Sequence, residues 1–160
     1  MFLEQAIFTT VIDSTPLVSI DLVVINENNQ ALLGKRLNRP AKDYWFVPGG
    51  RILKNESLED AFKRLTKGEL GEQYLINEAS LLGPYDHFYD DCVVNEAIST
   101  HYVAIAYILK VKSNILGNLP IAEQHSNYNW LSIEELLNDN DVHKHTKWYF
   151  EAINTRGILE

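Results

Sequence analysis

The segment 45–71, WFVPGGRILKNESLEDAFKRLTKGELG, places a carboxylate on a helix face that is otherwise apolar. At ~100° per residue, Leu58, Phe62, Leu65 and Glu69 fall on nearly one line of the helix that this pattern predicts. A carboxylate on a buried face is costly unless a bound cation or an ion pair compensates its charge. The position of Glu69 therefore predicts one of these two partners.

The adjacent glycines, Gly49 and Gly50, could supply a second group for a cation. Glycine permits tight turns and close approach, so it can expose a backbone carbonyl. Carbonyl and carboxylate oxygens are hard ligands that suit Mg²⁺. The alternative is that Glu69 pairs with Arg64 or Lys35 and that the glycines only make a turn, because short motifs are weak signals.

The periodicity of the chain predicts the elements that must position these residues. The predicted strands are a hairpin of 17–25 and 31–36, a short strand at 44–48, and strands at 80–90, 100–112 and 128–131. The predicted helices are 57–70, 132–137 and 142–153, the first two opened by capping boxes at Ser57 with Asp60 and Ser132 with Glu135. Strands interrupted by helices predict an α/β sandwich around a mixed sheet, in a single domain of residues 1–160.

Composition disfavours several classes of protein. The formal net charge of −8 is the wrong sign for binding a polymeric phosphate backbone, so no nucleic-acid partner is expected. Cys92 is the single cysteine, and the apolar run 102–109 is far shorter than the ~20 residues of a membrane span. Glu4 stands where a signal peptide would be basic. These features predict a soluble cytoplasmic protein that could still hold a small anionic ligand with a few arginines.

The spacing of five residues resembles the Nudix box, the loop–helix–loop of hydrolases that act on nucleoside diphosphates linked to another moiety: Gly50, Glu56, Arg64, Glu69 and Gly71. The resemblance implies a Nudix-type α/β/α sandwich around a mixed β-sheet. The chain departs from the family pattern at 64–69, which reads RLTKGE where the family has Arg-Glu-apolar-x-Glu-Glu, so two of three expected glutamates are missing. One carboxylate supports about one metal ion. That favours keeping the diphosphate whole as a leaving group while water attacks the carbon bonded to it.

Outside the box, the likeness narrows to the GDP-mannose mannosyl hydrolases, an atypical branch of the Nudix family. The segments that carry it are STPLVSIDLVV, LLGKRLNRPAKDYWFVPGGR, HFYDD, THYV and EQH, and they extend over nearly the whole chain. The resemblance implies hydrolysis of GDP-mannose, or of GDP-glucose, to GDP and free hexose with inversion at the anomeric carbon. It also implies one Mg²⁺ per subunit, which Mn²⁺ could replace, a homodimer, and a place in bacterial surface-polysaccharide metabolism.

The same resemblance assigns the metal ligands and the base. Mg²⁺ is expected at the Gly49 carbonyl, Glu69 and Gln124, and His125 is expected to take a proton from water. Histidine suits this role because it ordinarily titrates near pH ~6.5. A lone histidine in a loop is otherwise a solvated surface residue, and the proximity of His125 to Gln124 favours the catalytic interpretation.

Arginines are expected to bind the diphosphate. Arg36 is the candidate for a bidentate grip on the β-phosphate, where it would stabilise the charge that grows as GDP departs. Arg51 and Tyr102 are expected to assist it. Arg39 and Lys35 are interpreted as solvated neighbours.

Asp21 lies inside an apolar strand, where an uncompensated carboxylate is expensive. It could orient His125, bind a sugar hydroxyl or form a structural ion pair. His87 is a further candidate for substrate binding. Arg64 is expected to pair with Glu56 within the helix.

Aromatic and apolar residues near the N-terminus form the last group of candidates. The resemblance implies that the segment of Phe2, Leu3 and Phe8 contacts the nucleotide, in the same subunit or across a dimer, whereas such residues often only pack on a core. Two other functions stay open at this stage. One is a conventional Nudix diphosphohydrolase that cuts the P–O–P bond, and the other is an inactive module that senses a nucleotide.

Overall fold

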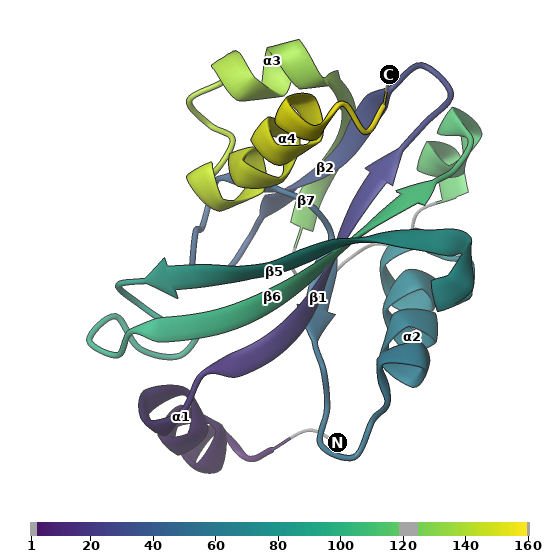
Figure 1. Ribbon diagram of the computed structural model, residues 1–160. Coiled ribbons are helices and arrows are strands. Elements are labelled where there is room, and N and C mark those ends of the chain that lie inside the picture. The colour runs from purple at the N-terminus through teal and green to yellow at the C-terminus, as the bar shows by residue number, and fades with distance from the viewer. Residues whose placement is uncertain (1–2, 119–124, 160) are drawn as a thin grey trace.

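The computed structural model describes residues 3–118 and 125–159. A mixed seven-stranded sheet forms the middle layer, with strand order β3-β2-β1-β6-β5, β4 paired to β1 and β7 paired to β2 (Figure 1). β1 and β6 run parallel along nine residue pairs, and the other pairings are antiparallel. The strands are β1 (Leu17–Ile25), β2 (Gln30–Arg36), β3 (Trp45–Phe46), β4 (Gly49–Arg51), β5 (Ala79–Tyr89), β6 (Thr100–Lys110) and β7 (His125–Ser132).

Helices cover both faces of this sheet, which confirms the predicted α/β/α sandwich. In Figure 1, α2 lies against one face, and α3 and α4 lie against the other. The helices are α1 (Gln5–Ser14), α2 (Leu58–Leu70), α3 (Ile133–Asn138) and α4 (Lys144–Arg156), with short 3₁₀ turns at Ile76–Glu78 and Ser113–Asn118. That the chain forms a single domain stays a prediction.

The alternation of side chains along β1 creates two separate cores. Leu22 and Val24 pack into the cluster that contains the apolar face of α2, and Val23 and Ile25 pack into the cluster that contains α4. The strand is apolar on both faces because both faces are covered. By the same alternation, Asp21 lies on the α4 face of the sheet.

Local signals explain why α2 begins and ends where the sequence predicts. The Ser57 hydroxyl accepts a hydrogen bond from the backbone N–H of Asp60 at 3.1 Å, and Gly71 ends the helix with a left-handed φ of 80°. Phe62 is fully buried, as its place on the apolar face predicts. Leu58 is 43% exposed, so its assignment to the buried face is wrong: it is the first residue of the helix and projects beyond the edge of the core.

Besides the 3₁₀ turns, one helix and one strand were not predicted. Residues 5–14 form α1 although the run Thr9 to Ile12 is β-branched, which favours a strand. Glu4 occupies the N-cap position without a side-chain capping bond, so the usual start signal is missing as well. The unpredicted strand is β4, which includes the glycine pair.

Candidate active site

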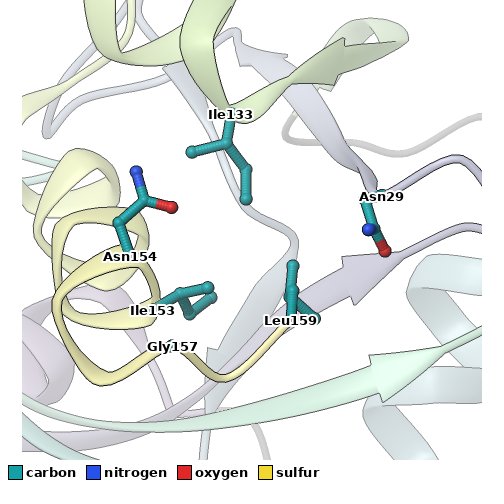
Figure 2. Close-up of a pocket in the computed structure, with 6 residues that line it drawn as sticks. All are labelled: Asn29, Ile133, Ile153, Asn154, Gly157 and Leu159. Atoms are coloured by element: carbon teal, nitrogen blue, oxygen red, sulfur yellow. The ribbon is translucent and has the colours of Figure 1, made fainter.

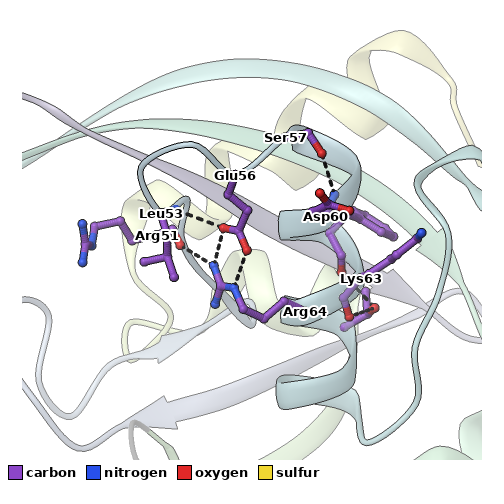
Figure 3. Close-up of polar contacts among 9 residues, drawn as sticks. Arg51, Leu53, Glu56, Ser57, Asp60, Lys63 and Arg64 are labelled. Carbon is purple, nitrogen blue, oxygen red and sulfur yellow. Dashed lines mark hydrogen bonds and ion pairs between the residues drawn. The ribbon is translucent and has the colours of Figure 1, made fainter. Parts of the chain in front are cut away.

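An ion pair fixes the loop that leads into α2 (Figure 3). Arg64 donates from Nε to Glu56 Oε2 at 2.7 Å and from Nη2 to Oε1 at 2.9 Å. Arg64 also donates to the Arg51 carbonyl at 2.9 Å, and Glu56 accepts from the backbone N–H of Leu53 at 3.0 Å. The hydrogen bonds from Arg64 lower the pKa of Glu56 to about 2. The predicted pair is confirmed, and the engagement of Arg64 argues against the alternative in which it pairs with Glu69.

The glycine pair does more than make a turn, because Gly49 and Gly50 belong to β4 and pair with β1. The N–H of Leu22 donates to the Pro48 carbonyl at 2.8 Å. The next pair along the strands, Asp21 opposite Gly49, is therefore a non-hydrogen-bonded pair of the antiparallel ladder. At such a position the backbone N–H and C=O point away from the partner strand. The Gly49 carbonyl is thus turned away from β1, as a metal ligand would need.

Both glycines permit contacts that a side chain would block. A Cβ on Gly49 would lie 2.7 Å from Asp21 Oδ1, and a Cβ on Gly50 would lie 2.6 Å from Leu65 Cδ2. Leu65 and Glu69 are four residues apart and share a face of α2. The contact of Gly50 with Leu65 therefore brings β4 to the helix face that carries Glu69.

Glu69 has a buried carboxylate oxygen that nothing in the described part of the chain satisfies. This oxygen, Oε2, lacks a hydrogen-bond partner there. Burial raises the pKa of Glu69 to about 7, against a smaller lowering by the charge of Arg36. The carboxylate of Glu69 and the Gly49 carbonyl, which points away from β1, are hard oxygen ligands that fit a cation such as Mg²⁺. Gln124, the third predicted ligand, lies outside the described residues.

Among the described residues of the box, only one carboxylate is available to a cation. Position 65 is a buried leucine, and Gly68 has open space where a side chain would stand, so neither replaces the missing glutamates. Across residues 3–118 and 125–159, no three His, Cys, Asp or Glu side chains come together as a metal site. The described residues thus fit a single cation bound through Glu69.

On the α4 face, Asp21 belongs to a buried hydrogen-bonded group. The Tyr149 hydroxyl lies 2.5 Å from Asp21 Oδ2 and 3.2 Å from His87 Nε2. His87 Nδ1 lies 4.0 Å from the same Asp21 oxygen. Burial raises the pKa of Asp21 to about 6, although the hydrogen bond from Tyr149 and the charge of Arg36 oppose it, and burial lowers the pKa of His87 to about 4. The structure thus joins two of the predicted residues, Asp21 and His87, through a third residue that was not predicted.

Stacked imidazoles support this group from the side of α4. The rings of His87 and His145 are 4.4 Å apart and only 8° from parallel, and His143 lies 4.5 Å from His145. Burial lowers the pKa of His143 to about 4 and of His145 to about 3, so the rings are neutral near pH 7. A signal for this cluster exists in the sequence HKHTKWY at 143–149, where His145 and Tyr149 are four residues apart on one helix face.

Arg36 carries a charge that acts on carboxylates of both faces of the sheet. Its Nε donates to the Pro40 carbonyl at 3.0 Å, and its guanidinium lies 6.0 Å from the centre of the Phe46 ring. Its positive charge acts on the pKa of both Asp21 and Glu69. The register of β2 with β7 sets the backbone of Arg36 opposite that of His125, after a bulge. Arg36 is therefore central to the candidate site, and the predicted base begins the neighbouring strand.

Comparison with known proteins identifies the family of this chain. The family model described as NUDIX domain matches residues 15–152. The chain belongs to the Nudix family. It is 43% identical over 116 residues to the low-salt glycan biosynthesis protein Agl8 of Haloferax volcanii, a match that spans 72% of this chain and 70% of that protein.

Solved Nudix structures share its fold. The MutT protein of Methanosarcina mazei Go1 matches with a TM-score of 0.71 at 19% identity, covering 90% of this chain and 97% of that one. A MutT NUDIX hydrolase of Burkholderia pseudomallei matches with a TM-score of 0.68 at 25% identity, covering 88% and 99%. The chain is thus a Nudix hydrolase in fold and family, and Nudix hydrolases generally use divalent metal ions.

The N-terminal helix approaches the predicted phosphate-binding residues of this Nudix chain. The Arg51 guanidinium lies 4.7 Å from the centre of the Phe8 ring, a cation–π distance. Phe8 and Tyr102 both pack against a small third cluster of Ile12, Leu17 and Cys92. Phe8, Arg51 and Tyr102 are therefore brought together, whereas Leu3 is half-buried before α1 with no contact to them established, and Phe2 lies outside the described residues. The homodimer stays a prediction.

The interpretation of Arg39 as a solvated residue is wrong. Arg39, expected to be a solvated neighbour, donates from Nη1 to Glu96 at 2.6 Å and from Nε to the Cys92 carbonyl at 3.3 Å. It ties the loop after β2 to the loop after β5. This contact spans 57 residues of sequence, so no local pattern could reveal it.

A separate cavity of ≈ 230 Å³ lies beside α3 and the end of α4 (Figure 2). Its lining shares no residue with the candidate site: Asn29, Ile133, Ile153, Asn154, Gly157 and Leu159. No helix in the described part of the chain is long and apolar enough to cross a membrane.

Proposed function

We propose that this Nudix hydrolase cleaves GDP-mannose, or GDP-glucose, to GDP and free hexose by attack of water at the anomeric carbon, with inversion. The observation that carries the proposal is the carboxylate of Glu69, which has an oxygen without a partner among the described residues, in a box where Leu65 and Gly68 stand in place of glutamates. One carboxylate suits a site that stabilises an intact diphosphate leaving group. The relative named for glycan biosynthesis is consistent with a sugar-containing substrate.

In the proposed reaction, the oxygen of water bonds to C1 of the hexose while the bond from C1 to the β-phosphate oxygen breaks. The electron pair of that bond leaves with GDP, and the proton of water passes to His125. A Mg²⁺ ion held by Gly49, Glu69 and Gln124 would neutralise charge on the diphosphate. Arg36 stabilises the same developing charge, and loss of one such contact typically costs ~3–4 kcal/mol.

The sugar is proposed to lie on the α4 side of Arg36, against Asp21 and His87. Both side chains are largely buried, with 13% and 3% of their area exposed, and both carry atoms that accept hydrogen bonds from hydroxyls. Arg51, Tyr102 and Phe8 lie together at the end of β4 and suit the nucleotide end of the substrate.

Hydrolysis in ¹⁸O-labelled water tests which bond breaks. The label is expected on C1 of the hexose, with GDP unlabelled and the β-anomer appearing first from an α-linked substrate. A Glu69→Gln enzyme prepared in parallel should release neither product and controls for a contaminating hydrolase. Label in a phosphate, or GMP among the products, would overturn the proposal and leave the family assignment intact.

A further inference from the structure

Tyr149 is a fully buried residue that contacts two polar side chains on the α4 face, Asp21 and His87. Its hydroxyl lies 2.5 Å from Asp21 Oδ2 and 3.2 Å from His87 Nε2. The contacts join residues 128 and 62 positions apart in the chain. A single hydroxyl on α4 therefore connects β1 to β5.

The chemistry of these groups fixes the direction of the hydrogen bonds. An ionised carboxylate only accepts, so the one proton of the Tyr149 hydroxyl goes to Asp21. The hydroxyl oxygen then accepts from His87, which must carry its proton on Nε2. His87 is thereby held in one tautomer, with a lone pair on Nδ1 that lies 4.0 Å from Asp21 Oδ2.

Packing holds all three side chains in this arrangement. The Tyr149 ring meets the Tyr85 ring edge-on at 4.8 Å, and the His87 ring stacks on His145 at 4.4 Å. Asp21 Oδ1 faces the space that Gly49 leaves open. Rotation of any one of them would break a contact, so the group is rigid before a ligand arrives.

We propose that Tyr149 is a positioning residue, whose hydroxyl fixes the Asp21 carboxylate and the His87 tautomer so that both present acceptors to hydroxyl groups of the substrate. The inference rests on the proposed function, because it places the sugar against Asp21 and His87. Tyr149 itself does not touch the substrate. Its effect is confined to recognition of the sugar and to the orientation of the reacting carbon.

Tyr149→Phe removes the hydroxyl and keeps the ring, and Tyr85→Phe is the matched control on the adjacent ring. Loss of a buried hydrogen bond to a charged group is expected to lower kcat/KM for GDP-mannose by ~10–100-fold. Inhibition by GDP, which lacks the sugar, should change by less than ~2-fold, since preserved contacts keep their binding energy. Tyr85→Phe should leave both values unchanged.

Coupling to Asp21 separates positioning from a general loss of structure. Adding Tyr149→Phe to Asp21→Asn should cost little more than Asp21→Asn alone, because the hydroxyl acts through that carboxylate. Independent losses that multiply, or equal weakening of GDP and GDP-mannose, would overturn the inference. If the wild type yields GMP, the proposed function fails; if it yields GDP and Tyr149→Phe is fully active, only this inference fails.

The tautomer of His87 provides a readout that needs no activity. Imidazole ¹⁵N chemical shifts of the wild-type protein should show His87 protonated on Nε2 and not on Nδ1. A proton on Nδ1 would contradict the hydrogen-bond direction. This measurement decides the matter even if Tyr149→Phe does not fold.

Discussion

Glu56 and Glu69 lie near opposite ends of α2 and have opposite environments. Glu56 precedes the helix and accepts two hydrogen bonds from Arg64, with a pKa lowered to about 2. Glu69 lies in the last turn with a buried oxygen unsatisfied by the described residues, and burial raises its pKa to about 7. The described residues satisfy the carboxylate of Glu56 and leave one oxygen of Glu69 without a partner.

This difference predicts that, within one motif, Glu56 is a structural carboxylate and Glu69 a ligand-binding one. A paired, hydrogen-bonded carboxylate stabilises the folded chain, whereas an unpaired buried one costs stability and persists where a ligand offsets the cost. The two glutamates should therefore respond to substitution in opposite ways. Glu69 should matter for activity and Glu56 for stability.

The largest effect is expected for Glu69→Gln. The neutral amide loses the charge that holds a hard cation, and a metal supplies several kcal/mol to the reaction, so activity should fall by at least ~10⁴-fold. Calorimetric titration with Mg²⁺ should lose the one tight site per chain. Without metal, the variant should be at least as stable to urea as the wild type, because an amide costs less to bury than an unpaired carboxylate.

Glu59→Gln is the control, since Glu59 is an exposed residue of the same helix. It removes the same charge and should change neither metal binding nor activity. Two or more tight, activity-linked ions in the wild type would restore a multi-metal site and weaken the contrast between Glu56 and Glu69.

His125→Gln should lower kcat by ~10²–10⁴-fold with a much smaller change in KM, because a base acts in the transition state while the arginines still bind substrate. If Glu69 binds the metal, as we propose, a histidine is left to accept the proton. The wild-type rate should therefore fall as the pH drops through ~6.5, the ordinary histidine range. His101→Gln, at a half-buried histidine of β6, is the control. A fully active His125→Gln enzyme would return the base role to a carboxylate.

How much the sequence could predict depends on how far apart in the chain the two residues of each contact are. The Glu56–Arg64 pair spans eight residues and α2 carries its own cap and period, so both were predicted and confirmed. The contact of Tyr149 with Asp21 spans 128 residues and depends on which face of β1 meets α4. Local patterns place Asp21 in a strand and hold no information on its partner.

The glycine pair shows a second limit. The sequence left open whether the two glycines only make a turn. In the structure Gly49 and Gly50 pair with β1, because without side chains they fit against Asp21 and Leu65. Strand pairing of such short segments is decided by the neighbouring strand and helix. The direction of the Gly49 carbonyl, on which the proposed metal site depends, could be derived only from that pairing.

The buried histidines differ from both glutamates, because burial keeps them neutral in the folded chain. The pKa of His145 is lowered to about 3 by burial, and those of His87 and His143 to about 4, each from about 6.5. As the pH falls below 6.5, these histidines become protonated in the unfolded chain but stay neutral in the folded chain. The free energy of unfolding therefore decreases as the pH falls from 6.5 towards 4. Replacing one such histidine should remove about one proton from this uptake.

His145→Phe tests the acid sensitivity, since the Nδ1 of His145 has no hydrogen-bond partner among the described residues and the ring packs among aromatic side chains. Between pH 7.5 and 5, the wild type should lose about 2 kcal/mol more unfolding free energy than the variant. Urea titrations at both pH values measure the difference. An equal loss in both proteins would mean that His145 is protonated in the folded state.

The smallest effect on activity is expected for Glu56→Gln, which completes the contrast with Glu69. The pair with Arg64 is only partly exposed and bidentate, so its loss should lower the free energy of unfolding by ~1 kcal/mol at pH 7. Because the pKa of Glu56 is lower in the folded chain, this stabilisation is present above the ordinary glutamate pKa of 4.5 and disappears as the pH falls towards 2. The stability gap between wild type and variant should close over that interval, while activity at pH 7 stays within ~3-fold.

Arg64→Lys keeps the charge but loses the bidentate geometry, and a double-mutant cycle with Glu56→Gln should show the coupling directly. If Glu56→Gln instead abolished activity and Mg²⁺ binding at unchanged stability, Glu56 would belong to the metal site, and pairing in the folded chain would no longer distinguish structural from functional carboxylates in this box.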